Sequence, residues 1–120
     1  DMVFFKENGI SISGAKYVHL PYGPVPQNFD LLFGTMSATH VAHIEVEYEG
    51  GYENHEVIPE CEVPKNVLSE KELEVLERVY NKFKNGSVEI SNYSHNEKGY
   101  TMTNQGEVIP YSYAKYIELN

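Results

Sequence analysis

The strongest pattern of apolar and polar positions in the chain is helical and begins near residue 69. Ser69 and Glu72 have the spacing of a capping box, in which each side chain binds a free backbone N–H at the start of a helix. Apolar residues then recur at intervals of three and four, as they do on one face of a helix: Leu73, Leu76, Tyr80 and Phe83. Asn85-Gly86 ends the pattern, which therefore predicts a helix over about residues 69–84.

A period of two replaces the helical period between residues 43 and 58. Three apolar residues (Ile44, Val46 and Tyr48) alternate with three acidic ones (Glu45, Glu47 and Glu49). Gly50-Gly51 can take the positive φ angles of a two-residue turn, which would pair Glu49 with Tyr52. That register also places Glu45 opposite Glu56, and the two carboxylates would repel each other. A wider loop with a shifted register is therefore an alternative. We expect a β-hairpin with one glutamate face.

Weaker patterns predict short helices in the rest of the chain. A helix over residues 1–8 should stop at Asn8-Gly9, another should cover residues 29–36, and Ser87 should cap a third that runs to about residue 95. A turn is expected at residues 96–99, and Ile109-Pro110 should begin a last helix. Residues 15–26 include three prolines, which favour an extended or turning chain, and Pro26 could start the next helix. The predicted fold class is α+β: a mainly α-helical single domain with one small antiparallel β-hairpin.

Composition and charge limit the possible partners. The chain has 120 residues, with nine Lys or Arg and 18 Asp or Glu, and its formal charge is −9. No Lys or Arg occurs between Lys16 and Lys65, and this stretch holds eight acidic residues: Asp30, Glu45, Glu47, Glu49, Glu53, Glu56, Glu60 and Glu62. Nucleic acids and anionic membranes bind basic surfaces, so we expect no direct binding of nucleic acid and no membrane contact. A basic protein partner remains compatible with this charge.

The sequence offers little for catalysis or for a cofactor. Cys61 is the only cysteine, and its neighbours Glu60 and Glu62 disfavour the thiolate that catalysis requires. One cysteine and five scattered histidines do not form a metal-ligand pattern, so we expect no metal and no cofactor. A single cysteine also excludes an internal disulfide and fits a cytoplasmic protein. The protein is expected not to be an enzyme, although a hydrolase that uses His95 stays open as an alternative.

Two ordered motifs carry a resemblance to a known family. Tyr22-Gly23-Pro24-Val25 comes first, and Ser91-Asn92-Tyr93-Ser94-His95-Asn96-Glu97 follows the capped helix. In this order they resemble the Panacea domain, the SocA-like antitoxin domain often labelled phage-associated. The resemblance implies one such domain over residues 1–120, N-terminally truncated because most of the family's first helix is missing. The motif residues expected to shape the domain are Tyr22, Gly23, Pro24, Val25, Ser91, Ser94, His95 and Glu97.

The resemblance also implies a function. Family members bind and neutralise the toxin of a bacterial or phage toxin–antitoxin pair, and some act as adaptors that hand the toxin to a protease. Others resemble transcription regulators, so the alternative is a C-terminal partner-binding domain whose DNA-binding module lies upstream. We expect a basic toxin to contact Glu45, Glu47, Glu49, Tyr22, Tyr93 and His95. The position of His95 near the end of a helix favours a purely structural role, in which it locks the junction of helix and loop.

Overall fold

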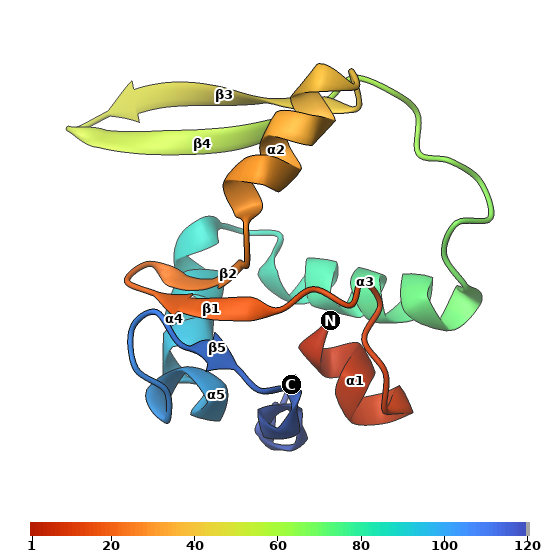
Figure 1. Ribbon diagram of the computed structural model, residues 1–120, viewed down its shortest axis with the longest axis vertical. Helices are drawn as coiled ribbons and strands as arrows, with labels where there is room; N and C mark the ends of the chain where they lie inside the picture. The colour runs from red at the N-terminus through yellow and green to blue at the C-terminus, as the bar shows by residue number, and fades with distance from the viewer. Residues whose placement is uncertain (120) are drawn as a thin grey trace. The chain divides into compact units, whose positions relative to one another are not determined.

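The computed structural model describes residues 1–119, and the chain forms two compact units (Figure 1). Unit 1 contains residues 1–27 and 66–119, and unit 2 contains residues 28–65. In the described part of the chain, the strands form two antiparallel sheets, one of three strands and one of two. No helix among these residues has the length and apolar character needed to cross a membrane.

The sheet of unit 1 is built from three short strands. β1 (Tyr17–Leu20) pairs with β2 (Gly23–Pro26) through a tight turn and, on its other side, with β5 (Val108–Ile109). The sheet therefore joins residues near the start of the chain to residues near its end. Helix α4 packs against β2, as can be followed in Figure 1.

This sheet corrects the predicted fold class. Helices make up 43% and strands 22% of the chain, so the fold is a balanced α+β structure rather than a mainly helical one with a single hairpin. The prolines misled the prediction because a proline has no N–H to donate to a strand ladder. Here β2 is an edge strand, and the Gln27 N–H points to β1, where it bonds the Lys16 carbonyl (2.7 Å). By alternation, Pro24 and Pro26 direct their nitrogens to the free edge.

The strongest helix prediction is confirmed. Helix α3 (Glu70–Phe83) begins with the complete capping box: the Glu72 N–H donates to Ser69 Oγ (3.2 Å) and the Ser69 N–H donates to the Glu72 carboxylate (2.7 Å). Helix α1 (Met2–Asn8) is also confirmed and ends at Gly9, whose φ is 75°. The start of α3 and the end of α1 are both determined by neighbouring residues, and such local signals can be recognised in a sequence.

The second half of unit 1 departs from the predictions in detail. Helix α4 (Ser87–Asn96) exists, but Gly86 precedes it as the cap, and Ser87 makes no capping bond. The turn expected at residues 96–99 leads into a short helix, α5 (Lys98–Thr101). Ile109 lies in β5 instead of a helix, and the segment after Pro110 is the 3₁₀ helix η1 (Tyr111–Tyr116). Here β pairing overrides the local helix signal.

The core of unit 1 is small. Its most buried apolar side chains are Phe4, Val75, Ile109 and Ala114, each 4% exposed or less. Gly99 is buried against this cluster, because a Cβ at that position would lie 2.7 Å from Ile109 Cγ2. At the periphery, Arg78 of α3 forms an ion pair with Glu7 of α1. The helices and the sheet of unit 1 therefore meet around residues from both halves of the chain.

Unit 2 consists of a helix and a hairpin. Helix α2 (Phe29–Ala38) packs against β3 (Ala42–Glu49). The helix begins three residues after Pro26, so Pro26 lies in β2 and not, as predicted, in the first helical turn. β3 pairs with β4 (Tyr52–Pro59) in the two-residue register, with Glu49 opposite Tyr52 and Glu45 opposite Glu56. Gly50 and Gly51 both have positive φ, 58° and 84°. The wider loop is therefore not adopted.

Candidate functional site

His95 links the two family motifs. Its Nδ1 lies 2.6 Å from the carbonyl oxygen of Ser91, and its Nε2 lies 3.0 Å from the carbonyl oxygen of Pro21. A carbonyl oxygen only accepts hydrogen bonds, so both contacts are satisfied when both ring nitrogens carry a proton. These bonds, first that to Pro21 and then that to Ser91, raise the pKa of His95. The ring clamps α4 to the β1–β2 turn, and both contacts favour its protonated form.

Tyr100 supports this clamp from α5. Its hydroxyl donates to the carbonyl oxygen of Leu20 (2.6 Å), and its ring meets His95 edge to face, with centroids 4.7 Å apart. The other side of the Tyr100 ring stacks on His19 at 3.7 Å. His19 in turn binds the hydroxyl of Thr103 through Nδ1 (3.0 Å). No pattern in the sequence relates His19 to Tyr100 and His95, because only the β1–β2 hairpin brings it beside them.

Gly23 allows the close approach of the hairpin to α4. It is buried with a φ of 125°, and a Cβ there would lie 3.3 Å from Ser94 Oγ. The Ser94 hydroxyl donates to the Ser91 carbonyl (2.9 Å), the same oxygen that binds His95. Pro24 and Val25 continue β2 and are half-buried. The motif residues Gly23, Ser91, Ser94 and His95 thus meet at one junction inside unit 1.

Tyr22 and Tyr93 differ in their availability. Tyr22 lies in the β1–β2 turn with 92% of its surface exposed. Tyr93 is half-buried: its hydroxyl donates to the Glu118 carbonyl (2.8 Å) and its ring packs against Phe83. Burial, together with the nearby Glu97 carboxylate, raises the pKa of Tyr93 to about 12. The Tyr93 side chain is thus held by contacts within unit 1, whereas the Tyr22 side chain is accessible to a binding partner.

The chemistry at His95 does not favour hydrolysis. A general base needs a ring nitrogen that can reach a substrate proton, and both nitrogens of His95 lie within hydrogen-bond distance of backbone carbonyl oxygens. Cys61 is exposed, and its sulfur contacts the Val41 carbonyl oxygen at 3.7 Å. Within residues 1–119, no three His, Cys, Asp or Glu side chains are grouped so that they could hold a metal ion. The junction is built for holding two segments together.

The predicted acidic residues lie on one face of the unit 2 hairpin. Glu45, Glu47 and Glu49 point to the same side of β3, and Glu56 lies opposite Glu45 on β4. Every residue from Glu45 to Val57 is exposed, and we call this segment the hairpin arm. Its other face presents Val46, Tyr48 and Val57, which are 43%, 76% and 47% exposed, together with the paired side chains of Glu53 and His55. The arm thus has a glutamate face and a mixed face with three exposed apolar side chains.

His43 stands at the base of the arm between two carboxylates. Its Nε2 lies 3.1 Å from Glu45 Oε1, and its Nδ1 lies 3.3 Å from Glu60 Oε1. The hydrogen bond to Glu45 is the largest of the effects that raise the pKa of His43. A histidine whose pKa is raised therefore lies at the base of the arm, next to its first glutamate. Glu60 lies beyond the hairpin predicted over residues 43–58, so the sequence pattern did not place it beside His43.

Comparison with known proteins agrees with the motifs. Neither curated proteins nor solved structures gave a match. The model of one family, described as "Antitoxin SocA-like, Panacea domain", matches residues 1–100. The matched range contains both motifs, the capped helix α3 and the whole of unit 2. Because this match covers most of its length, the chain belongs to the SocA-like Panacea antitoxin family.

Proposed function

We propose that this protein neutralises a protein toxin by binding it through the hairpin arm of unit 2, and that the toxin is basic where it meets the arm. Membership of an antitoxin family supports antitoxin-type function in general and a protein partner. The observation that carries the finer proposal is the glutamate face of the arm. Glu45, Glu47 and Glu49 are all exposed there, and no Lys or Arg occurs from residue 17 to residue 64 to neutralise them.

The arm has the physical properties of a recognition element. An acidic face accelerates encounter with a basic partner and opposes encounter with an acidic one. Surface charge alone adds little affinity, so a stable complex also requires apolar contact. Tyr48 and Tyr52 supply it near the turn, where they are 76% and 80% exposed, and tyrosine is enriched in protein interfaces. Charge would thus guide the approach of the toxin, and the aromatic tip would hold it.

The test is a charge reversal on the arm. The protein encoded beside this one serves as the candidate toxin, and both growth rescue and Kd are measured. The triple variant Glu45→Lys, Glu47→Lys, Glu49→Lys should abolish rescue and raise Kd by about 10- to 100-fold, as expected for the loss of several interfacial charges. A matched control reverses three exposed glutamates outside the arm, Glu62, Glu89 and Glu118, and should change Kd less than about threefold.

Two outcomes would contradict parts of this proposal. If the arm variant binds as tightly as the parent protein, the toxin does not use the acidic face, even where rescue shows an antitoxin. If the arm and control variants weaken binding equally, only net charge matters and the arm has no special role. Both variants must first give the circular dichroism spectrum and melting profile of the parent.

Delivery of the bound toxin to a protease is a finer form of the same proposal. An adaptor must contact the protease with residues other than those that hold the toxin, and unit 1 contains none of the arm residues. The measurement is the half-life of the toxin after protein synthesis is stopped, with and without this protein. An adaptor shortens that half-life, whereas a protein that only masks the toxin lengthens it or leaves it unchanged.

A further inference from the structure

Helix α3 leaves part of its apolar stripe uncovered. The stripe predicted from the sequence includes Leu73, Leu76 and Tyr80, which are 52%, 43% and 67% exposed. The buried side of the helix is instead centred on Val75, which is 4% exposed. Three large apolar side chains aligned along one helix form a contiguous surface, and such surfaces on folded domains mark sites of interaction.

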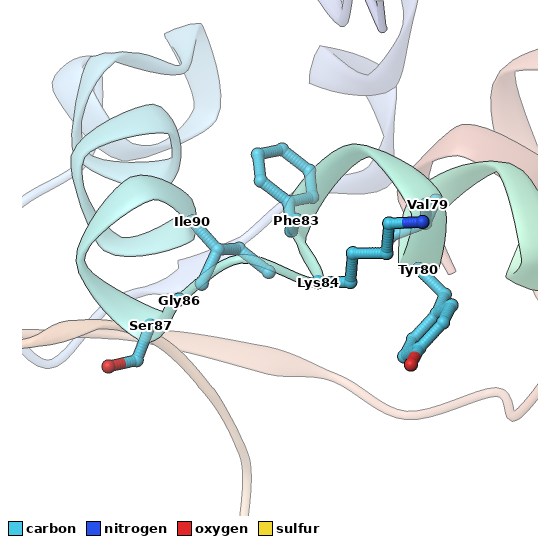
Figure 2. A pocket seen from close by; sticks show the side chains of 7 residues that line it. All are labelled: Val79, Tyr80, Phe83, Lys84, Gly86, Ser87 and Ile90. Carbon is cyan, nitrogen blue, oxygen red and sulfur yellow. The ribbon is translucent and has the colours of Figure 1, made fainter.

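The stripe continues into a groove between α3 and α4. The groove has a volume of about 280 Å³ and an apolar lining that includes Val79, Tyr80, Phe83 and Ile90. Figure 2 shows Tyr80 and Lys84 on the α3 side and Ser87 and Ile90 on the α4 side. This volume lies just below the range of pockets for drug-sized ligands, so the groove suits one or two apolar side chains of a larger partner.

Acidic residues border the stripe on its solvent side. Glu70, Glu74 and Glu77 are exposed and recur at intervals of four and three, so they form a row parallel to Leu73, Leu76 and Tyr80. Within the described residues, the carboxylates of Glu70 and Glu77 form no ion pair. Charge complementarity therefore calls for an occupant with Lys or Arg along one edge and apolar side chains beside them.

We propose that the stripe and groove of α3 and α4 bind an amphipathic helix of a protein partner, with apolar residues at helical spacing and a basic edge that faces the glutamate row. An apolar helix face laid into a groove between helices is a common mode of peptide recognition. This surface lies wholly within unit 1 and uses no residue of the hairpin arm. It is a second interaction site, and it can be tested without knowledge of the toxin.

The probe is a fluorescein-labelled 14-residue peptide of leucine and lysine whose leucines fall on one helical face. A second peptide has the same composition in an order that destroys the face, and a third carries glutamate in place of lysine. Fluorescence anisotropy with the 120-residue chain should give a Kd at least tenfold lower for the first peptide than for either other peptide. Equal affinity of the two lysine peptides would overturn the proposal, because attraction would then depend on charge alone.

Variants of the protein locate the site. Leu76→Ser and Tyr80→Ser should each raise the Kd of the amphipathic peptide at least fivefold, since both side chains are exposed and anchor the stripe. The control Val63→Ser removes an apolar side chain that is 85% exposed outside the stripe, and the arm variant Glu45→Lys, Glu47→Lys, Glu49→Lys provides a second control; both should change Kd less than twofold. Loss of binding in the controls but not in Leu76→Ser would place the peptide elsewhere and overturn the proposal.

Sedimentation of the free protein separates this occupant from a second copy of the chain. A monomer at micromolar concentration supports a foreign helix as the occupant. A dimer that Leu76→Glu converts to a monomer shows that the stripe is a self-association surface, and the proposal is then wrong.

Discussion

His95 couples the protonation of one residue to the stability of the junction between the motifs. Both of its ring nitrogens face backbone carbonyl oxygens, at 2.6 Å and 3.0 Å, so the neutral ring can satisfy one contact and the cation can satisfy both. The folded state therefore raises the pKa of His95 above its usual value. Since the folded state holds the proton more tightly than the unfolded state, folding stability must depend on pH.

The first prediction follows from the sign of this shift. The contribution of His95 is fully present below the unfolded pKa of about 6.5 and is lost as the pH rises through the higher folded pKa. The melting temperature should thus fall as the pH rises above about 6.5. His43 has a raised pKa for a different reason, mainly its bond to Glu45, and adds a fall of the same sign.

Substitution separates the two histidines. His95→Gln should lower the melting temperature at about pH 6 and flatten its dependence on pH. His43→Gln should remove only the share of this pH dependence that His43, in unit 2, contributes. Circular dichroism melts over the same pH range measure both effects. If the melting temperature of the His95→Gln variant keeps the full slope of the parent, the His95 clamp does not contribute to folding.

Gly99 gives the second prediction at the residue scale. An added Cβ would lie 2.7 Å from Ile109 Cγ2 and 3.3 Å from Tyr113 Cβ, and Ile109 is 4% exposed with little freedom to move. Gly99→Ala should therefore lower the free energy of unfolding by about 1–3 kcal/mol, the usual cost of overpacking a core. Urea unfolding followed by circular dichroism measures the change.

The same substitution at Gly34 is the matched control. Gly34 lies inside α2, and an added Cβ there would meet no atom within 4 Å. Because alanine stabilises a helix interior relative to glycine, Gly34→Ala should raise the free energy of unfolding by about 0.5–1 kcal/mol. A loss of stability at Gly34, or none at Gly99, would contradict the packing argument.

At the scale of elements, the sequence predicted what local chemistry controls. The alternating residues and Gly50-Gly51 predicted the β3–β4 hairpin and offered the observed register as one of two, and the capping box predicted the start of α3. β1 and β2 were missed although their pairing is local, because the three prolines of this stretch argued against a strand ladder. β5 was missed because its pairing with β1 is not local. β5 has only two residues, which are too few to show a period in the sequence. It is a strand only because it pairs with Tyr17 and Val18, near the other end of the chain.

The candidate site shows the same limit. The motifs named Gly23, Ser94 and His95, but no spacing could reveal that Pro21 and His95, 74 positions apart, share a hydrogen bond. His19 belongs to no motif, and Tyr100 follows the second motif without any spacing that relates it to Leu20, so neither contact at the junction could be predicted. The sequence also could not predict that Leu73, Leu76 and Tyr80 are exposed, because a helical pattern identifies an apolar face and not what covers it.

The third prediction tests the capping box as the start signal of α3. Ser69→Ala removes the acceptor for the Glu72 N–H and should lower the free energy of unfolding by about 1 kcal/mol. Ser87→Ala is the control, because the Ser87 side chain makes no capping bond at the start of α4, and its effect should stay within about 0.5 kcal/mol. Equal losses at both serines would show that the hydroxyl at position 69 does not act as a cap. Urea unfolding measures both variants.

At the scale of the whole molecule, the charge follows the division into units. Unit 2 holds eight acids and one base, a net −7, and unit 1 holds the other ten acids and eight bases, a net −2. Unit 2 also has almost no interior, since Ala42 is the one buried side chain among its described residues. A unit with so little buried apolar surface gains little stability of its own. We infer that unit 2 is maintained for contact with a partner rather than for its own packing.

The connector between β4 and α3 gives the last prediction, which concerns where the intact chain is cut. The connector has neither helix nor strand, and its Val63 and Val67 are 85% and 67% exposed. A protease needs an extended, accessible segment, and cleavage inside a helix must wait for local unfolding. Limited digestion with trypsin should therefore cut first after Lys65, at least about tenfold faster than after Lys71 or Arg78 within α3. Mass spectrometry of early time points identifies the products, and Lys65→Gln should delay the first cut by a similar factor. A first cut within α3 would mean that this helix, despite its cap and the buried Val75, opens more readily than the connector.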